Sequence, residues 1–369
     1  MKIVCISAAQ IPSDTANSIQ VMKVCQSFVQ IGNEVTLLVP GNQQSEISNQ
    51  QLIERYGLQT TFPIVWLPVR NRWLFPWKAV WRARRLGADL LYVWPLQSAV
   101  LGLLAGSPTM LELHDVPTGH VGPFWLRLFL VCPGRKRLLP ISDALRRLLH
   151  LPEAQTVTAS DGVDLERYVA LPRPEAARRI LELPEAPTVL CTGHLYAGRG
   201  ADLFLRLAAK FPLASFVWVG GRPLDVENWK LRAAGQSNVT FTGFVPNESI
   251  PLYQSAAEVL LMPYQRTVAT SSGGNTAAVC SPMKMFEYMA ARRAILSSDL
   301  PVLHEVLDAS MAVFCASDDP SAWEPALGKL LNDEKQRNAL GERARLAVEQ
   351  YSWVRRARRV LEGFNEIPA

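Results

Sequence analysis

The first forty residues read MKIVCISAAQIPSDTANSIQVMKVCQSFVQIGNEVTLLVP (1–40). The runs MKIVCIS and EVTLLVP are rich in Val, Ile and Leu, as is typical of strands buried in a parallel sheet. The stretch between them, SIQVMKVCQSFVQIG, has the helical period and ends at Gly32. This order of strand, helix and strand predicts a βαβ unit and therefore an α/β fold.

The same alternation continues through the first half of the chain. Further strands are predicted at FPIVWLPV (62–69), DLLYVWP (89–95), TMLELHD (109–115) and RLLPIS (137–142). Ser142 is the expected N-cap of a helix in SDALRRLLH, whereas Asn17 or Ser18 is the expected cap of the first helix. Residues 1–164 should therefore form one doubly wound, Rossmann-like domain.

A proline-rich interruption separates this half from a second βα series. Pro172, Pro174, Pro184 and Pro187 fall within residues 165–187, which we expect to be a linker. The predicted strands beyond it are TVLCTGHL (188–195), SFVWVGG (215–221), NVTFTGF (238–244), EVLLMPY (258–264), AILSSD (294–299) and AVFCAS (312–317). Residues 188–351 should form a second Rossmann-like domain, with a helix in 352–369 packing back on the first. Two such domains facing each other would bring the carboxyl ends of both sheets to one cleft, the expected active site.

Composition excludes several classes of protein. A net charge of +5 over 369 residues is well short of the concentrated basic surface of a nucleic-acid-binding protein. Six widely spaced cysteines show no zinc or redox spacing and indicate buried thiols in a reducing compartment. The N-terminus suits a strand better than a signal peptide, and no apolar run is long enough to span a bilayer. We therefore expect a cytoplasmic protein.

Two motifs in the second half carry a family resemblance. GHLYAGRGADLFLRLA (193–208) and SPMKMFEYMAARRAILSSDLPVLHEV (281–306), in this order, resemble the family 4 retaining glycosyltransferases. SDGVDLERY (160–168) is similar to the NGVD segment of that family. The resemblance implies the two-domain GT-B fold, an acceptor-side N-terminal domain and a donor-binding C-terminal domain. It also implies transfer of a hexose-type sugar, with retention, from a nucleotide-diphosphate sugar to an acceptor hydroxyl.

The second motif suggests an anion site at a helix N-terminus. Ser281 is the expected cap, Pro282 suits the first helical position, and the free N–H groups that follow, from Met283 on, favour a phosphate. Lys284 lies in the first turn, and Glu287, three residues on, shares its face. The family resemblance assigns Glu287 to the ribose of the donor. A plain surface Lys/Glu pair is the alternative.

The sequence departs from the family at one position of this motif. Many members have two glutamates separated by seven residues, the second of which matches Glu287, but here Val279 stands in place of the first. The form SPMKMFEYMA resembles a variant that lacks the first acid. No role is therefore expected for an acidic group at position 279.

The first motif places glycines between a strand and a helix. Gly193, Gly198 and Gly200 would permit a tight turn and close approach of the backbone to a phosphate. By resemblance, Arg199 matches the basic residue that binds the donor diphosphate, and His194 stands where many relatives have arginine. The pocket for the nucleotide base is expected at the backbone near Phe244 and Val245.

His114, at the end of the strand TMLELHD, is the candidate catalytic residue of the first domain. In relatives a histidine here contacts the donor sugar, and a neutral ring would donate to a sugar hydroxyl or offset developing charge. A structural histidine is the alternative. No metal or other cofactor is expected, because Arg199, Lys284 and helix N–H groups can meet the phosphate charge. With no separate nucleophile in view, front-side attack with retention is the expected mechanism of this glycan-building enzyme.

Three other functions also use paired or single Rossmann-like domains. A nicotinamide-dependent enzyme would need G-x-G-x-x-G after the first strand, and the sequence has none there. A two-lobed sugar-binding protein would also close two α/β lobes on a ligand, but the expected lack of an export signal argues against it. A sugar-nucleotide epimerase of the same fold stays open. The acceptor itself, a glycan, a lipid-linked sugar or a small molecule, cannot be read from the sequence.

Two segments of the first domain combine tryptophan with basic residues. No acid occurs between Arg55 and Ala88, nor in HVGPFWLRLFLVCPGRKRLLP (120–140). The first segment contains Trp66, Trp73, Trp77 and Trp81 together with Arg70, Arg72, Lys78, Arg82, Arg84 and Arg85. One interpretation is a peripheral contact with anionic lipid at the inner face of the membrane. The other is that the tryptophans pack a crossover helix onto the sheet.

Overall fold

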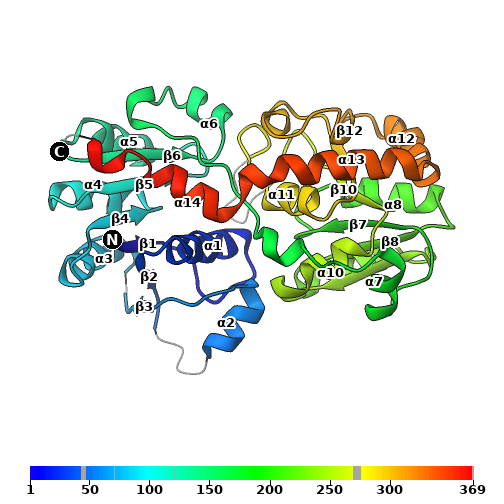
Figure 1. Ribbon diagram of the computed structural model, residues 1–369, viewed down its shortest axis with the longest axis horizontal. Helices are drawn as coiled ribbons and strands as arrows, with labels where there is room; N and C mark the ends of the chain where they lie inside the picture. The colour runs from blue at the N-terminus through cyan, green and yellow to red at the C-terminus, as the bar shows by residue number, and fades with distance from the viewer. Residues whose placement is uncertain (43–46, 70, 120, 269–275, 368–369) are drawn as a thin grey trace. The chain divides into compact units, whose positions relative to one another are not determined.

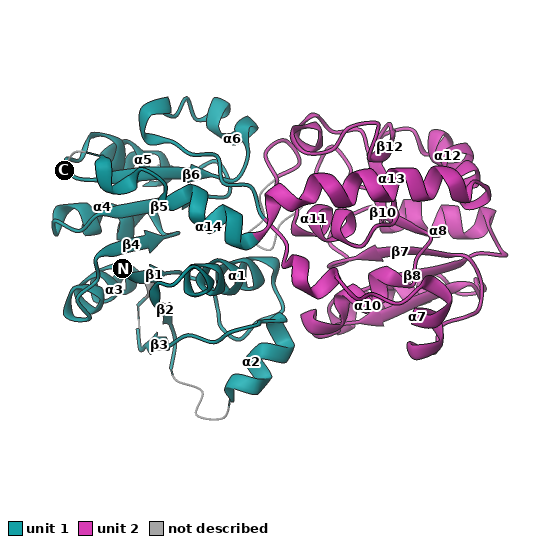
Figure 2. Cartoon of the chain, in the orientation of Figure 1, with its two compact units in different colours: residues 1–161, 353–369 teal, residues 162–352 magenta. Residues whose placement is uncertain are grey.

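The computed structural model describes residues 1–369 apart from 43–46, 70, 120, 269–275 and 368–369 (Figure 1). The chain divides into two compact units (Figure 2). Unit 1 comprises residues 1–161 and 353–369, and unit 2 comprises residues 162–352. Unit 1 is therefore discontinuous in sequence, because its last helix follows all of unit 2.

Unit 1 contains a six-stranded parallel sheet in the order β3-β2-β1-β4-β5-β6. Its strands are β1 Lys2–Ile6, β2 Glu34–Pro40, β3 Ile64–Leu67, β4 Leu90–Val93, β5 Thr109–Leu113 and β6 Lys136–Pro140. Five of them lie within a predicted strand, β6 begins one residue before its predicted strand at 137–142, and the predicted doubly wound α/β fold is confirmed. The strand order reverses between β1 and β4, and the loops beyond the carboxyl ends of the strands at such a reversal are where ligands bind to open α/β sheets.

The helices of unit 1 follow the predicted alternation. They are α1 Ala16–Gln30, α2 Asn49–Tyr56, α3 Phe75–Arg85, α4 Leu96–Leu104, α5 Val121–Val131, α6 Asp143–Leu148 and α14 Trp353–Leu361. Ser142 caps α6 as predicted, since its hydroxyl accepts from the N–H of Leu145. The predicted cap of α1 was wrong: Thr15, not Asn17 or Ser18, is the N-cap, and its hydroxyl accepts from the N–H of Ser18. The helix begins one residue before Asn17, so Asn17 and Ser18 already lie inside its first turn.

The C-terminal helix α14 belongs to unit 1 (Figure 2). It packs against α1, and Arg137 of β6 donates to the carbonyl oxygens of Val360 at 2.6 Å and Glu362 at 2.7 Å. Because Arg137 is buried, these bonds satisfy a charged group that would otherwise be costly to bury. The sheet thus holds the end of the chain through side chain to backbone bonds.

Unit 2 repeats the same architecture. Its strands, in the sheet order β12-β11-β10-β7-β8-β9, are β7 Thr188–Thr192, β8 Ser215–Val219, β9 Val239–Gly243, β10 Val259–Met262, β11 Ala294–Ser298 and β12 Ala312–Cys315. Its helices are α7 Pro174–Ile180, α8 Ala201–Lys210, α9 Pro223–Arg232, α10 Ile250–Ser255, α11 Met283–Ala290, α12 Pro320–Asn332 and α13 Glu334–Ala347. The buried aromatic residues Phe204, Phe216 and Trp218 meet edge to face beneath α8, which fixes this helix over the strands that lead into the site.

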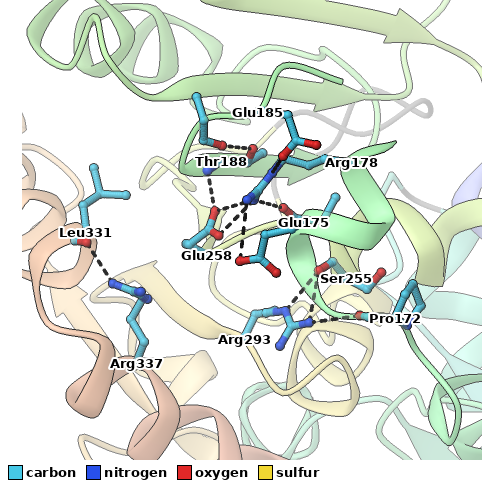
Figure 3. A network of polar contacts seen from close by, with 12 residues as sticks. Pro172, Glu175, Arg178, Glu185, Thr188, Ser255, Glu258, Arg293, Leu331 and Arg337 are labelled. Carbon is cyan, nitrogen blue, oxygen red and sulfur yellow. Dashed lines mark hydrogen bonds and ion pairs between the residues drawn. The ribbon is translucent and has the colours of Figure 1, made fainter. Parts of the chain in front are cut away.

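Residues 165–187 contain the 3₁₀ turn Leu165–Tyr168 and α7, and both lie in unit 2. Arg178 of α7 is buried and donates to both carboxylate oxygens of Glu258, at 2.9 and 3.0 Å. Glu258 also accepts from the N–H of Thr188, the first residue of β7 (Figure 3). Nearby, the guanidinium of Arg293 donates to the carbonyl oxygen of Ser255. This network ties α7 to the start of β7 and explains why the proline-rich stretch is an ordered part of unit 2.

Among the described residues, no helix is long and apolar enough to cross a bilayer.

Substituting Glu258→Gln should lower the free energy of unfolding of unit 2 by roughly 3 kcal/mol, because the buried Arg178 would lose its close carboxylate at 2.9 Å and keep only longer carboxylate contacts, with Glu175 and Glu185, at 3.8 and 4.0 Å. Urea denaturation of the full chain measures this. The matched control is Glu324→Gln, which removes an exposed partner of Lys210 at 3.7 Å and should cost about 1 kcal/mol or less. Equal losses in the two variants would contradict the role given to the Arg178–Glu258 pair.

Candidate active site

Two cationic side chains of unit 2 meet beside the loop that follows β7. Lys284, in the first turn of α11, is buried, and its Nζ lies 3.9 Å from the sulfur of Cys191 near the end of β7. A Cβ atom on Gly193, the first residue after the strand, would lie 3.4 Å from Nζ. The ammonium group therefore lies directly against the backbone of the glycine loop.

Tyr264, just beyond β10, holds both cations. Nη1 of Arg199 donates to its hydroxyl at 2.8 Å, with the guanidinium 5.0 Å from the ring centroid, and Nζ of Lys284 lies 5.2 Å from the same centroid. Within the described residues, neither cation has a carboxylate within 4 Å, and the buried Nε of Arg199 has no acceptor. Two positive groups held together without a counter-charge form a site suited to a doubly charged anion such as a diphosphate.

Backbone conformation and close packing also require glycine at two positions of the loop. Gly198 and Gly200 have φ of +80° and +84°, a region that residues with a Cβ rarely adopt. A Cβ on Gly198 would lie 1.9 Å from the carbonyl oxygen of Thr267, and one on Gly200 would lie 2.0 Å from that of Pro263. The segment after β10 thus fills the space beside both glycines, and their lack of side chains lets that segment and Tyr264 approach Arg199.

The start of α11 differs from the prediction. The helix begins at Met283 and its N-cap is Pro282, without a side-chain cap hydrogen bond, so the predicted capping by Ser281 was wrong. Proline has no polar side chain, so the N-cap residue itself gives the first turn no side-chain acceptor. Lys284 still lies in that first turn, where the positive end of the helix dipole adds to its charge.

Glu287 of α11 is held by a residue of α10. It accepts from Nε2 of Gln254 at 3.2 Å, and Oε1 of Gln254 accepts from the hydroxyl of Tyr168 at 2.9 Å. Tyr168 and Gln254 are buried, and burial together with the charge of Glu287 raises the pKa of Tyr168 well above its usual value. Residues of two distant segments therefore orient the carboxylate. Sequence reasoning assigned no role to either residue: Gln254 lies in no recognisable motif, and Tyr168 only ends the segment SDGVDLERY.

The remaining predicted donor residues lie around the carboxyl edge of the same sheet. The rings of His194 and Tyr196 are stacked, with 4.9 Å between their centroids. The guanidinium of Arg222 lies over the Tyr196 ring, 5.1 Å from its centroid. Phe244 follows β9 and is 42% exposed; Val245 is partly buried beside it. This stacking gives a pair of flat surfaces near the glycine loop that the sequence alone did not suggest.

His114 belongs to unit 1 and follows β5. Its Nε2 lies 2.8 Å from Oε1 of Glu112, which is fully buried within the strand. Glu112 also accepts from Gln20, Tyr92 and Arg356, the last at 2.8 Å. Sequence reasoning missed this cluster. The signal that could have revealed it is an acidic residue in the middle of an otherwise apolar strand.

The charges in this cluster set its protonation. Burial alone would raise the pKa of Glu112, but Arg356 and His114 outweigh burial and lower it to about 2. Burial lowers the pKa of His114, yet the hydrogen bond and charge of Glu112 outweigh that effect and raise it. Desolvation raises the pKa of the neighbouring Asp161 to about 6. Glu112 therefore stabilises the protonated form of the His114 ring relative to the neutral form that the sequence led us to expect.

Substituting Glu112→Gln should lower the pKa of His114, because it removes the acceptor and negative charge that raise this pKa while burial remains. Titration of the His114 ring followed by NMR measures it, with circular dichroism to check that the variant is folded. His304, which pairs with Asp299 in unit 2, serves as an internal control and should not shift. An unchanged His114 pKa would show that Glu112 does not govern its protonation.

Known proteins resemble this chain in part of its sequence and in its fold. Residues 186–333 match the family model described as Glycosyl transferases group 1. Over 124 residues the chain is 31% identical to the D-inositol 3-phosphate glycosyltransferase of Corynebacterium urealyticum, a match that covers 33% of this chain and spans about a quarter (26%) of that relative.

Solved structures cover nearly the whole chain. The Anabaena protein Alr3699/HepE, in complex with UDP-glucose, has a TM-score of 0.77 at 14% identity, with 100% of both chains covered. The sucrose-phosphate synthase of Thermosynechococcus elongatus has a TM-score of 0.75 at 16% identity, covering 99% of this chain and 98% of that one. At these identities the likeness concerns the fold. The chain therefore has the predicted GT-B fold, and its residues 186–333 carry the sequence pattern of Glycosyl transferases group 1.

Proposed function

We propose that this protein is a retaining glycosyltransferase that moves a hexose-type sugar from a nucleotide-diphosphate sugar to an acceptor hydroxyl. The observation that carries the proposal is the pair Arg199 and Lys284, held by Tyr264 beside Gly193 with no carboxylate partner among the described residues. A diphosphate would supply the missing negative charge. The matching family model over residues 186–333 supports the same chemistry.

In this proposal the two cations act on the leaving group. Breaking the bond between the anomeric carbon and the diphosphate oxygen leaves negative charge on the phosphate and positive character on the sugar. Arg199, Lys284 and the N–H groups at the start of α11 stabilise that negative charge. The acceptor oxygen attacks from the face that the diphosphate leaves, and a leaving-group oxygen takes the acceptor proton. Retention of configuration follows from attack on that face.

Other residues position the donor. Glu287, oriented by Gln254, accepts hydrogen bonds from the ribose hydroxyls. The base lies near Phe244 and Val245. His114 donates a hydrogen bond to a sugar hydroxyl or offsets developing charge on the sugar. Unit 1 serves the acceptor, which is a glycan, a lipid-linked sugar or a small molecule, and the enzyme builds glycans in the cytoplasm.

The first test is donor binding and turnover. UDP-glucose is tested first, followed by GDP- and ADP-sugars, because a solved structure of the same fold holds UDP-glucose. A donor at a hundred times its dissociation constant should raise the stability of the wild type by about 2.7 kcal/mol. Arg199→Ala and Glu287→Ala should each weaken donor binding by about 1.5 to 3 kcal/mol and abolish turnover. Thermal unfolding and product assay measure these effects.

The control variant is Arg206→Ala, which removes an exposed cation of α8 and should bind donor as the wild type does. Full activity of Arg199→Ala would exclude the donor site described above. Turnover of the donor sugar that is equally fast with and without acceptors would point to epimerisation or hydrolysis instead of transfer.

We further propose that the reaction needs no metal ion, since the cations Arg199 and Lys284 can neutralise the diphosphate. Turnover should be unchanged in excess EDTA. Activity that disappears in the chelator and returns with Mg²⁺ or Mn²⁺ would contradict this.

A further inference from the structure

Helix α3 exposes tryptophans on a face that the fold does not use. The helix packs on unit 1 through the buried residues Phe75, Pro76, Ala79, Val80 and Ala83. Trp77 and Trp81, one turn apart, are nevertheless 65% and 58% exposed, and Trp73, just before the helix, is 67% exposed. The helix therefore buries one apolar face and presents a second, aromatic one. Packing against the sheet, the alternative offered by the sequence, accounts only for Trp66, whose Nε1 donates to the carbonyl oxygen of Ile11 at 2.9 Å.

Helix α5 adds a second set of exposed apolar side chains in the same layer. It buries Leu126 and Phe129 but exposes Val121, Phe124 and Val131. Helix α4 packs against both α3 and α5, so the three helices lie along one side of unit 1 (Figure 1). Leu104, at the end of α4, is 65% exposed between them. We call these exposed side chains of α3, α4 and α5 the α3–α5 surface.

The charges on the α3–α5 surface have one sign. Lys78, Arg84 and Arg85 of α3 and Arg127 of α5 are exposed, and the guanidinium of Arg85 lies 4.1 Å from the ring centroid of Trp81. Neither helix contains an acidic residue. Two basic residues of the acid-free segment 120–140 do not belong to this surface. Lys136 is buried and donates to carbonyl oxygens at the end of α5. Arg137 is buried against α14. Arg70, His120 and the side chain of Arg72 lie outside the described part of the chain.

The topology relates this surface to His114. The strands of unit 1 are parallel, so the helices that connect them run back across the sheet and begin at its carboxyl edge. Trp73 and Trp77, at the start of α3, and Phe124, in the first turn of α5, therefore lie toward that edge. His114, directly after β5, lies at the same edge. The aromatic end of the surface is thus the end nearest to the reactive edge of unit 1.

We propose that the α3–α5 surface docks unit 1 on an anionic lipid bilayer. Exposed apolar area gathered over neighbouring helices marks an interaction site. Tryptophan rings prefer the headgroup level of a bilayer, and long cationic side chains reach from there to anionic headgroups. An interfacial helix combines these two groups on one face, as α3 does. The proposal goes beyond glycosyl transfer and does not depend on it.

The direct test is flotation of the full chain with vesicles at low ionic strength, where screening is weakest. Vesicles of phosphatidylcholine and phosphatidylglycerol in equal parts should carry the protein up the gradient, whereas vesicles of phosphatidylcholine alone should carry much less. Absence of binding to the anionic vesicles would overturn the proposal.

Substitutions on the α3–α5 surface test whether it is the part of the protein that binds the vesicles. Arg84→Gln and Arg85→Gln should each weaken binding to the anionic vesicles about fivefold, and Trp77→Ser with Trp81→Ser should weaken it further. All four positions are exposed, so the melting temperature should stay that of the wild type. The matched controls are Arg206→Gln with Lys230→Gln and Leu213→Ser with Leu224→Ser, exposed positions of unit 2. Equal losses in the controls, or none in the α3–α5 variants, would overturn the proposal.

A protein occupant gives a different result. If a second copy of the chain covers the surface, light scattering without vesicles should show a dimer that Trp77→Ser with Trp81→Ser dissociates, and this would overturn the membrane proposal. Donor-induced stabilisation, measured on the same variants, separates the two proposals. If a variant no longer floats with the vesicles but is still stabilised by the donor, then membrane docking and donor binding are separate properties.

Discussion

The buried pair of Glu112 and Arg356 is the interaction on which unit 1 depends. A carboxylate in the middle of a parallel sheet is far too costly to bury alone, and a guanidinium from the last helix neutralises it at 2.8 Å. Tyr92 donates to the same carboxylate, and Arg356 donates in turn to the carbonyl oxygens of Ala159 and Ser160. The pair thereby joins β5, the segment that leaves unit 1 and the helix that returns to it.

The two units use charge in opposite ways. In unit 1 the buried Glu112 is paired with Arg356 and His114, which holds the ring of His114 in place. In unit 2, Arg199 and Lys284 are brought together on Tyr264 although like charges repel. A compensated cluster stabilises the fold by itself, whereas paired cations without a carboxylate gain most when an anion binds. This contrast is why the proposed donor site is placed in unit 2.

Most of the fold could be predicted from the sequence, because buried parallel strands are short apolar runs and the intervening helices keep their own period. All the predicted strands are present. The predicted cap of α11 was wrong: local preference favours Ser281 at the N-cap and Pro282 at the first helical position, but the helix begins one residue later, at Met283. The contacts of Glu112 with Arg356 and of Glu287 with Gln254 could not be predicted, since they join residues 244 and 33 positions apart. Spacing along the chain carries no signal at such separations.

The position of α14 has a consequence for biosynthesis. Arg356 is made 244 residues after Glu112, which at 5–20 residues per second is a delay of roughly 12 to 50 s. During this time Glu112 of β5 is present in the nascent chain without its partner Arg356. Unit 2 is continuous and can complete its own sheet in that interval. We therefore expect unit 2 to fold first on the ribosome, and unit 1 to close only when α14 has emerged.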